Sequence, residues 1–143
     1  IAGADITDGH TDFYARFARP GLVVVSRDNY RDSPDYQITR DNIDILGSSA
    51  DAQGNKLELV IIDTPDVINE RFGVNDFAAG YIGYYVCNGA VIAQKFGDKP
   101  ADERAAQLLQ RCYPDRVIEQ LSIDGIASGG GSIHCATQQE IAV

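Results

Sequence analysis

Two stretches of mainly apolar residues have the length of short strand pairs, and a turn signal interrupts each of them. The first covers residues 13–26 with a turn at Arg19-Pro20-Gly21, and the second covers residues 81–94 with a turn at Asn88-Gly89. Asn-Gly is a strong signal for a two-residue turn, because both positions tolerate a positive φ angle. The pattern therefore predicts two β-hairpins separated by a longer segment.

A helical pattern follows each hairpin. The first helix is expected to begin at Ser33-Pro34, with serine as the N-cap and proline at the first helical position. Three later residues can share its apolar face: Tyr36, Ile43 and Leu46. The second helix is expected to begin near Lys99-Pro100 and to end before Pro114.

A further apolar strand closes each half of the chain, at residues 57–62 and 117–123. The order strand, strand, helix, strand therefore occurs twice, with a period of about 68 residues between Gly21 and Gly89. Repeats of one such unit imply that the units stack or form a ring around a shared core. The polar residues 64–76 between the halves predict a long loop, a kind of segment that often carries binding function.

Composition narrows the class of protein. The chain has 143 residues, enough for one domain with a real core, and no apolar run approaches the length that crosses a membrane. Its formal net charge of −9 argues against a nucleic-acid partner, which needs clustered Lys and Arg. The sequence contains no Met and starts at Ile1, so we expect it to be part of a longer polypeptide.

The three cysteines are widely spaced, and no Cys-x-x-Cys or Cys/His grouping is present. This argues against a metal site and favours a reducing, cytoplasmic environment. Most free cysteines are buried core residues, and Cys87 and Cys112 fit that pattern. Cys135 fits it less well, because three glycines precede it and a polar run follows, so it is a candidate nucleophile.

His10 and Asp12 form the second candidate group. In an extended segment both side chains would point the same way, offering a proton-transfer group beside a carboxylate. The alternative is a solvated surface loop. His134 is a weaker candidate, since on a strand it would face away from Cys135. The glycine run 129–131 lacks the ending of a phosphate-binding loop, so close approach of a flat ligand explains it better.

Together these motifs resemble the agmatine deiminase family and, more broadly, bacterial peptidyl-arginine deiminases. The resemblance rests on residues 8–12 with Arg16-Phe17, on Phe96-Gly97-Asp98 and on residues 129–139. It implies an α/β pentein fold, in which five strand-strand-helix-strand modules form a ring around a central site. The chain would then be the C-terminal part of a single catalytic domain, with about two of five modules. The module repeats would lie near residues 13–64 and 81–124, and residues 129–139 would carry the catalytic cysteine.

The resemblance implies a hydrolase that converts agmatine to N-carbamoylputrescine and ammonia through a covalent cysteine thiouronium. Cys135 would be the nucleophile, His10 the general acid and base, and Asp12 a carboxylate that binds the guanidinium. Gly130 and Gly131 would lie against the substrate. No metal or organic cofactor is implied. Two further acidic residues would come from preceding modules, so the isolated chain is expected to be inactive.

Several alternatives stay open. Arginine or peptidyl-arginine could replace agmatine as the small cationic substrate, and a non-catalytic guanidine-binding module could retain the fold. A homo-oligomer is also open, whereas a papain-like protease is disfavoured because the order of His and Cys is wrong. The chain departs from the family at Gly83, where asparagine is common, and at Gln94 and Ile141, where proline is usual.

Overall fold

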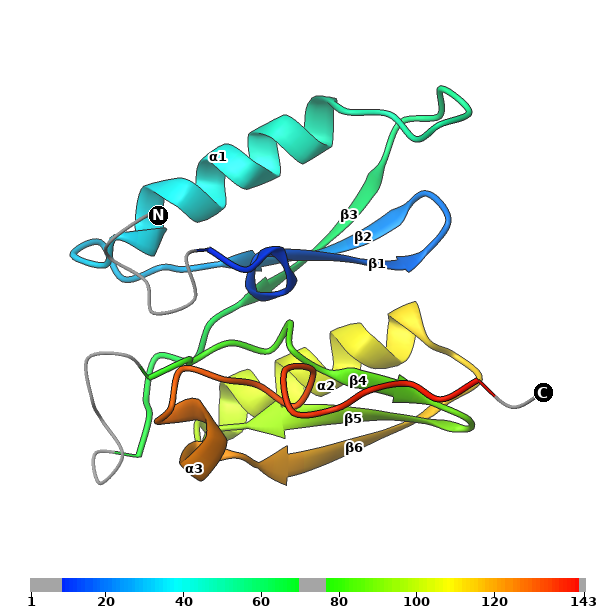
Figure 1. Cartoon of the computed structure of the whole chain (residues 1–143). Coiled ribbons are helices and arrows are strands. Elements are labelled where there is room, and N and C mark those ends of the chain that lie inside the picture. Colours follow the sequence, from blue (N-terminus) through cyan, green and yellow to red (C-terminus); the bar gives the residue numbers. More distant parts are fainter. Residues whose placement is uncertain (1–8, 70–76, 142–143) are drawn as a thin grey trace.

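A computed structural model describes residues 9–69 and 77–141 of the chain (Figure 1). The first half contains β1 (Ala15–Arg19), β2 (Leu22–Arg27), α1 (Asp35–Ser48) and β3 (Glu58–Asp63). The second half contains β4 (Tyr85–Cys87), β5 (Ala90–Lys95), α2 (Lys99–Cys112) and β6 (Val117–Ser122). A short 3₁₀ helix, η1 (Thr11–Phe13), precedes them, and α3 (Asp124–Ala127) follows. The described elements confirm the order strand, strand, helix, strand in both halves, while part of the expected joining loop, residues 70–76, lies outside the described ranges.

The two halves have the same sheet topology. In each three-stranded sheet the first strand runs antiparallel to the second, and the second runs parallel to the third. The hairpin turns also have matching roles: the carbonyl of Gly21 accepts a hydrogen bond from the amide of Glu58, and that of Gly89 accepts one from Val117. The period seen in the sequence is therefore a structural repeat. The number of modules in a ring stays a prediction.

The first helix begins slightly later than predicted. α1 starts at Asp35, with Pro34 at the capping position, and the hydroxyl of Ser33 accepts a hydrogen bond from the amide of Asp35 at 3.1 Å. Ser33 still satisfies a backbone donor at this end, but from one position further out. Ile43 and Leu46 pack against β2 as expected, but Tyr36 is not part of that cluster, and its ring stacks on the guanidinium of Arg40 at 3.5 Å.

The predicted fourth strand is too long at its start. Strand β4 covers only Tyr85–Cys87, because the four residues before it are buried and leave the ladder. The carbonyls of Ile82 and Tyr84 accept hydrogen bonds from the guanidinium of Arg16 on β1. Residues 82 and 84 lie outside the strand, and the Arg16 guanidinium is the donor that their carbonyls meet. A hairpin pattern in the sequence could not reveal this contact.

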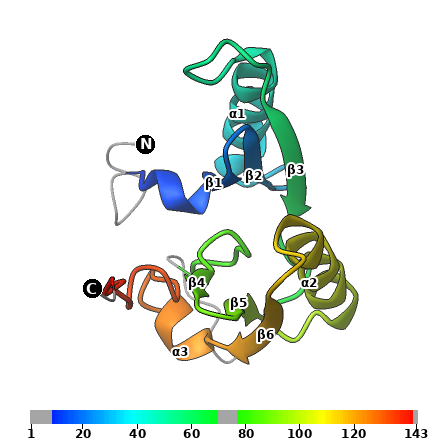
Figure 2. The same cartoon turned by 90° about the vertical axis from the view of Figure 1, so that its right-hand side faces the viewer.

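The core is built in layers. β2 is buried on both faces, so its side chains alternate between two apolar clusters. Val23 and Val25 face α1, where they pack with Ile43 and Leu46. On the other face the strand joins a larger cluster that includes α2 residues. α2 contacts β3 as well as its own sheet, so it lies between the two modules (Figure 2). Within the described ranges, no helix is long and apolar enough to cross a membrane.

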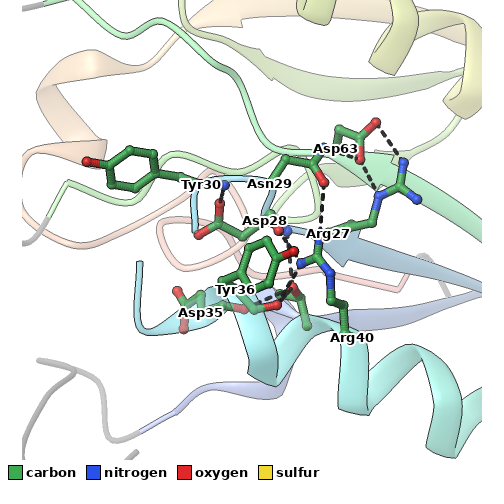
Figure 3. A network of polar contacts seen from close by, with 9 residues as sticks. Arg27, Asp28, Asn29, Tyr30, Asp35, Tyr36, Arg40 and Asp63 are labelled. Carbon is green, nitrogen blue, oxygen red and sulfur yellow. Dashed lines mark hydrogen bonds and ion pairs between the residues drawn. The ribbon is translucent and has the colours of Figure 1, made fainter. Parts of the chain in front are cut away.

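A polar network ties together the carboxyl ends of β2 and β3 (Figure 3). The guanidinium of Arg27 donates to both carboxylate oxygens of Asp63, at 2.6 and 3.1 Å, and Asn29 donates to the same carboxylate at 2.9 Å. Partial burial raises the pKa of Asp63, but these hydrogen bonds and the charge of Arg27 outweigh it, so the net pKa is lowered. Arg40 closes the network by donating to Asn29 and to the carbonyl of Asp28. The network fixes the connection that leads into α1.

A buried carboxylate joins α2 to the segment before β4. Asp102 accepts hydrogen bonds from the hydroxyl of Tyr81 at 2.8 Å and from the amides of Phe96 and Gly97 at 3.0 and 3.1 Å. Burial and the hydrogen bond to Asp102 raise the pKa of Tyr81 far above its usual range, so the phenol remains the donor. Two buried donors and the amide of the exposed Gly97 therefore depend on one side chain.

We predict that Asp102→Ala destabilises the full-length protein by about 3 kcal/mol, because it leaves two buried donors, the hydroxyl of Tyr81 and the amide of Phe96, without an acceptor. The matched control is Asp41→Ala on α1, where an exposed carboxylate accepts a hydrogen bond from Gln37 and the expected change is below about 0.5 kcal/mol. Urea titration followed by circular dichroism measures both. Equal midpoints for the two variants would contradict the assigned role of Asp102.

Candidate functional site

Two segments from opposite ends of the chain lie on the same side of the molecule. One is the loop that contains His10 and leads through η1 into β1, and the other is the segment after α3 that contains Cys135. Figures 1 and 2, which differ by a quarter turn, both place them on that side. All the residues singled out from the sequence as candidate site residues belong to these two segments.

The glycine run 129–131 packs tightly against α3. The amides of Gly129, Gly130 and Gly131 donate to carbonyls of Ile126 and Ala127 at 3.0 to 3.3 Å, so they do not form a cradle for a phosphate. Gly130 is buried with φ +76°, a conformation that glycine adopts without strain. A Cβ on Gly131 would lie 3.3 Å from the side chain of Ile126. Both glycines therefore have internal roles, and their contact with a substrate stays a prediction.

Cys135 lies in the turn that follows the glycine run. It is exposed, and Cys112 is buried as expected, whereas Cys87 is only half-buried and is not the core residue that the sequence predicted. Burial raises the pKa of the Cys112 thiol, which makes that cysteine a poor nucleophile. The buried hydroxyl of Ser132 lies 3.2 Å from Sγ of Cys135 and accepts a weak hydrogen bond from its amide at 3.4 Å. The turn therefore holds an accessible sulfur beside a hydroxyl.

His10 and Asp12 lie close together, but not on an extended segment as predicted. Asp12 is part of the 3₁₀ turn η1, because this short polar stretch closes local backbone hydrogen bonds from Phe13 to His10 and from Tyr14 to Thr11. Nδ1 of His10 lies 3.9 Å from Oδ1 of Asp12. The side chain of His10 is 57% exposed and that of Asp12 is 19% exposed, so the imidazole is accessible while the carboxylate is sheltered.

The expectation for His134 was wrong. Residues 133–136 form a turn instead of a strand, so neighbouring side chains do not alternate between two faces. Nδ1 of His134 lies 2.6 Å from Oδ2 of Asp12, across a separation of 122 positions in the chain. The signal that could have indicated this is the glycine run itself, because three glycines favour a turn over a strand.

The backbone of Gly83 is hydrogen-bonded to this turn. Its carbonyl accepts a hydrogen bond from the amide of His134 at 2.9 Å. A Cβ on Gly83 would overlap Cβ and Oγ of Ser132, so any larger residue there would displace Ser132 from its present position. Sequence reasoning noted Gly83 only as a departure and missed its contact with the cysteine turn.

The arrangement brings together a sheltered carboxylate and two imidazoles, and the turn that supplies one imidazole also carries an exposed cysteine. Asp12 touches His134 and lies near His10, and Cys135 directly follows His134 in the chain. Thiol, imidazole and carboxylate are the groups required for nucleophilic catalysis with proton transfer. That Cys135 and His10 face a common hollow stays a prediction. In residues 9–69 and 77–141 no group of three or more His, Cys, Asp or Glu side chains is placed to hold a metal ion.

Comparison with protein families gives one match over nearly the whole chain. The family described as Porphyromonas-type peptidyl-arginine deiminase matches residues 1–140. A Streptomyces coelicolor protein whose assigned name is that of an agmatine deiminase is 42% identical over 135 residues, covering 94% of this chain. Agmatine deiminase of Medicago truncatula is 33% identical over 162 residues and covers the whole chain. This chain spans only 39% and 43% of the lengths of these two relatives.

Solved structures agree with the sequence matches. The agmatine deiminase of Enterococcus faecalis superposes with a TM-score of 0.84 at 29% identity, covering 94% of this chain and 40% of that protein. A structure from Porphyromonas gingivalis whose assigned name is that of an arginine deiminase superposes with a TM-score of 0.85 at 25% identity, covering 96% of this chain and 40% of that protein. The α/β fold with mixed sheets is therefore the fold of these deiminases over the same part of the molecule.

We predict that Gly83→Ala lowers the stability of the full-length protein by about 1–3 kcal/mol, because the added methyl group overlaps Ser132. Gly80→Ala is the matched control in the same segment, since a Cβ there meets nothing within 4 Å. Thermal unfolding of both variants measures the difference. A melting temperature for Gly83→Ala that equals that of Gly80→Ala would refute the close packing described for the cysteine turn.

Proposed function

This chain belongs to the Porphyromonas-type peptidyl-arginine deiminase family, and on that basis we propose that the protein containing it is a hydrolase that deiminates a guanidine substrate. The favoured reaction is agmatine and water giving N-carbamoylputrescine and ammonia. Agmatine is favoured because relatives from Streptomyces, Medicago and Enterococcus carry that name. Since the chain spans about 40% of those proteins, the activity proposed is that of the whole protein.

One observation carries the proposal from the structure. The contact of Asp12 with His134 joins the first and the last motif of the resemblance, and it does so at the residue that precedes Cys135 in the chain. A guanidinium is planar, cationic and a poor electrophile, so an enzyme must hold it by carboxylates against a nucleophile. A carboxylate hydrogen-bonded to the histidine that precedes the cysteine in the chain supplies one carboxylate for this purpose. An exposed Cys135 is also accessible to a small substrate.

Asp12 can contact His134 and a substrate at the same time. An ionised carboxylate has about four lone-pair sites, and the bond to Nδ1 of His134 uses one of them. The remaining sites are available to N–H groups of a guanidinium, which favours paired hydrogen bonds. In the proposed mechanism Asp12 therefore binds and orients the substrate, and further acidic residues from outside the chain complete the binding of the cation.

The first chemical step forms a covalent intermediate. The thiolate of Cys135 attacks the central guanidine carbon, and a C–S bond forms. His10 donates a proton to the leaving nitrogen, the C–N bond breaks and ammonia departs. A thiouronium remains on Cys135. The exposed imidazole of His10, 3.9 Å from Asp12, is suited to this role because the leaving group can reach it.

The second step releases the product. His10, now without its proton, accepts one from a water molecule whose oxygen attacks the thiouronium carbon. The C–S bond breaks, and the thiolate and a urea product are released. Neither step requires a metal ion or an organic cofactor. Gly130 and Gly131 are proposed to lie against the flat group during both steps, beside the turn that carries Cys135.

We predict that Cys135→Ser in the full-length protein lowers ammonia release from agmatine by about a thousandfold or more, since it removes the nucleophile. The covalent adduct seen in the intact mass of the wild-type protein under rapid quench should also be lost. Cys87→Ser is the control, because that half-buried cysteine lies on β4 and should retain full activity. A different pair of results would indicate a binding module: the wild type releases no ammonia, and Cys135→Ser binds agmatine as tightly as the wild type does.

We also predict that the 143 residues alone release no measurable ammonia from agmatine, because the other acidic residues that bind the guanidinium are expected outside the chain. A coupled ammonia assay at high protein concentration tests this, with the full-length protein as the positive control. Turnover by the isolated chain would contradict the proposed division of the binding site.

A further inference from the structure

The carboxylate of Asp12 has a second protein contact that the mechanism above does not use. Its Oδ2 lies 2.6 Å from Nδ1 of His134, while its Oδ1 lies 3.9 Å from Nδ1 of His10. The contact with His134 is thus the shorter one, and it is sheltered, since the side chains of His134 and Asp12 are 36% and 19% exposed. A hydrogen bond of this length to a carboxylate is strong and directional.

We propose that His134 is a positioning residue that fixes the carboxylate of Asp12 for the guanidinium attacked by Cys135. This inference rests on the proposed function and deepens it. His134 itself touches neither the reacting carbon nor the leaving group in this scheme. It acts by limiting the rotation of the carboxylate, so that the carboxylate is already oriented when the substrate arrives.

The placement of His134 explains why it can do this. Its amide donates to the carbonyl of Gly83 at 2.9 Å, and its imidazole reaches Asp12, so the residue is held at both ends. The next residue in the chain is Cys135. The position of the carboxylate and the position of the sulfur are therefore set by two adjacent residues of one turn. A shift of one relative to the other would require the turn to change shape.

The chemistry of imidazole suits this role better than that of lysine or arginine. A neutral imidazole can donate Nδ1–H to a carboxylate without adding charge. A lysine or arginine at position 134 would place a permanent positive charge beside Asp12, where it would compete with a cationic substrate. His134 can therefore orient the carboxylate and leave its negative charge available to a guanidinium.

The identity of the contact atom gives a sharp test. Nδ1 is the ring nitrogen nearer the backbone, and the side-chain amide of asparagine can be placed at the same distance along the side chain. Glutamine places its amide one carbon further out, near the position of Nε2. His134→Asn should therefore retain the contact with Asp12, whereas His134→Ala and His134→Gln should lose it. The two amide variants have the same chemistry and differ only in reach.

The readout compares a cationic and a neutral alkylating agent of nearly the same shape, 2-chloroacetamidine and 2-chloroacetamide, on the full-length protein. The rate at Cys135 is followed by peptide mass spectrometry. An oriented Asp12 should favour the cationic reagent, so Asp12→Asn should lower the ratio of the two rates by about tenfold or more. His134→Ala and His134→Gln should lower it similarly, and His134→Asn should retain most of it. Glu140→Gln, a charge change on the same exposed segment, should leave the ratio unchanged.

The ratio of the two alkylation rates shows whether His134 orients Asp12 or only anchors the turn that carries Cys135. If His134 only anchored the turn, its loss would change both rates together and leave the ratio as in the wild type. The double variant Asp12→Asn with His134→Ala should be no lower than Asp12→Asn alone, since both changes remove one interaction. An unchanged ratio in both His134→Ala and His134→Gln would overturn the proposal, as would a His134→Asn ratio as low as that of His134→Ala.

Turnover of agmatine is measured in parallel and answers a separate question. In an active protein, His134→Ala should reduce kcat/KM by about 10- to 100-fold, with partial or full recovery in His134→Asn. If the wild type releases no ammonia while the alkylation ratios follow the expected order, the proposed reaction is wrong and the positioning of Asp12 by His134 stands. If the wild type is active and the ratios do not follow that order, the positioning is wrong and the reaction stands.

Discussion

The candidate site depends on the hydrogen bonds that the guanidinium of Arg16 donates to the backbone. From β1 it donates to the carbonyls of Ile82 and Tyr84, and it lies over the ring of Tyr84 at 4.3 Å. It thereby fixes a buried segment of the second module from a strand of the first. Between these two carbonyls is Gly83, whose own carbonyl accepts the amide of His134. The imidazole of His134 then returns to Asp12, four residues before Arg16 in the chain. The contacts form a closed circuit, so each segment of the site is fixed by another.

The circuit has a consequence for the sequence motif that contains Arg16. Arg16 was noted only as part of a resemblance, and a cation near a proposed guanidine site invites the interpretation that it binds a ligand. Its donors are directed to backbone carbonyls, and its planar group is stacked on an aromatic ring. These contacts give it a structural role: it supplies the donor that the carbonyls of residues 82 and 84 meet outside the strand. α2 also holds the two halves of the chain together, because it packs against β3 of the first sheet as well as against its own sheet.

Local patterns predicted the repeated units well, and long-range contacts account for what they missed. Asn88-Gly89 and the apolar runs beside it specify a hairpin through φ preference and burial, both of which are local properties. The exposure of Cys135 also followed from its neighbours. The partner of His134 could not be predicted in this way, since it lies 122 positions away and the contact requires both modules to be packed. The short β4 is a similar case. Its predicted first half includes Ile82 and Tyr84, whose carbonyls instead accept hydrogen bonds from a guanidinium on another strand.

The geometry of a guanidinium has a consequence for the proposed binding site. The group is a flat cation with N–H donors on several edges, and one carboxylate can pair with donors on one edge only. Asp12 is sheltered and already contacts His134, so it can serve that one edge. The donors on the other edges need further acceptors, and burying them unpaired would cost more than the first pair of hydrogen bonds contributes. Tight and oriented binding therefore requires acidic groups from a different direction. The pentein ring implied by the resemblance would supply such directions, because each of its modules could direct a loop toward a common axis.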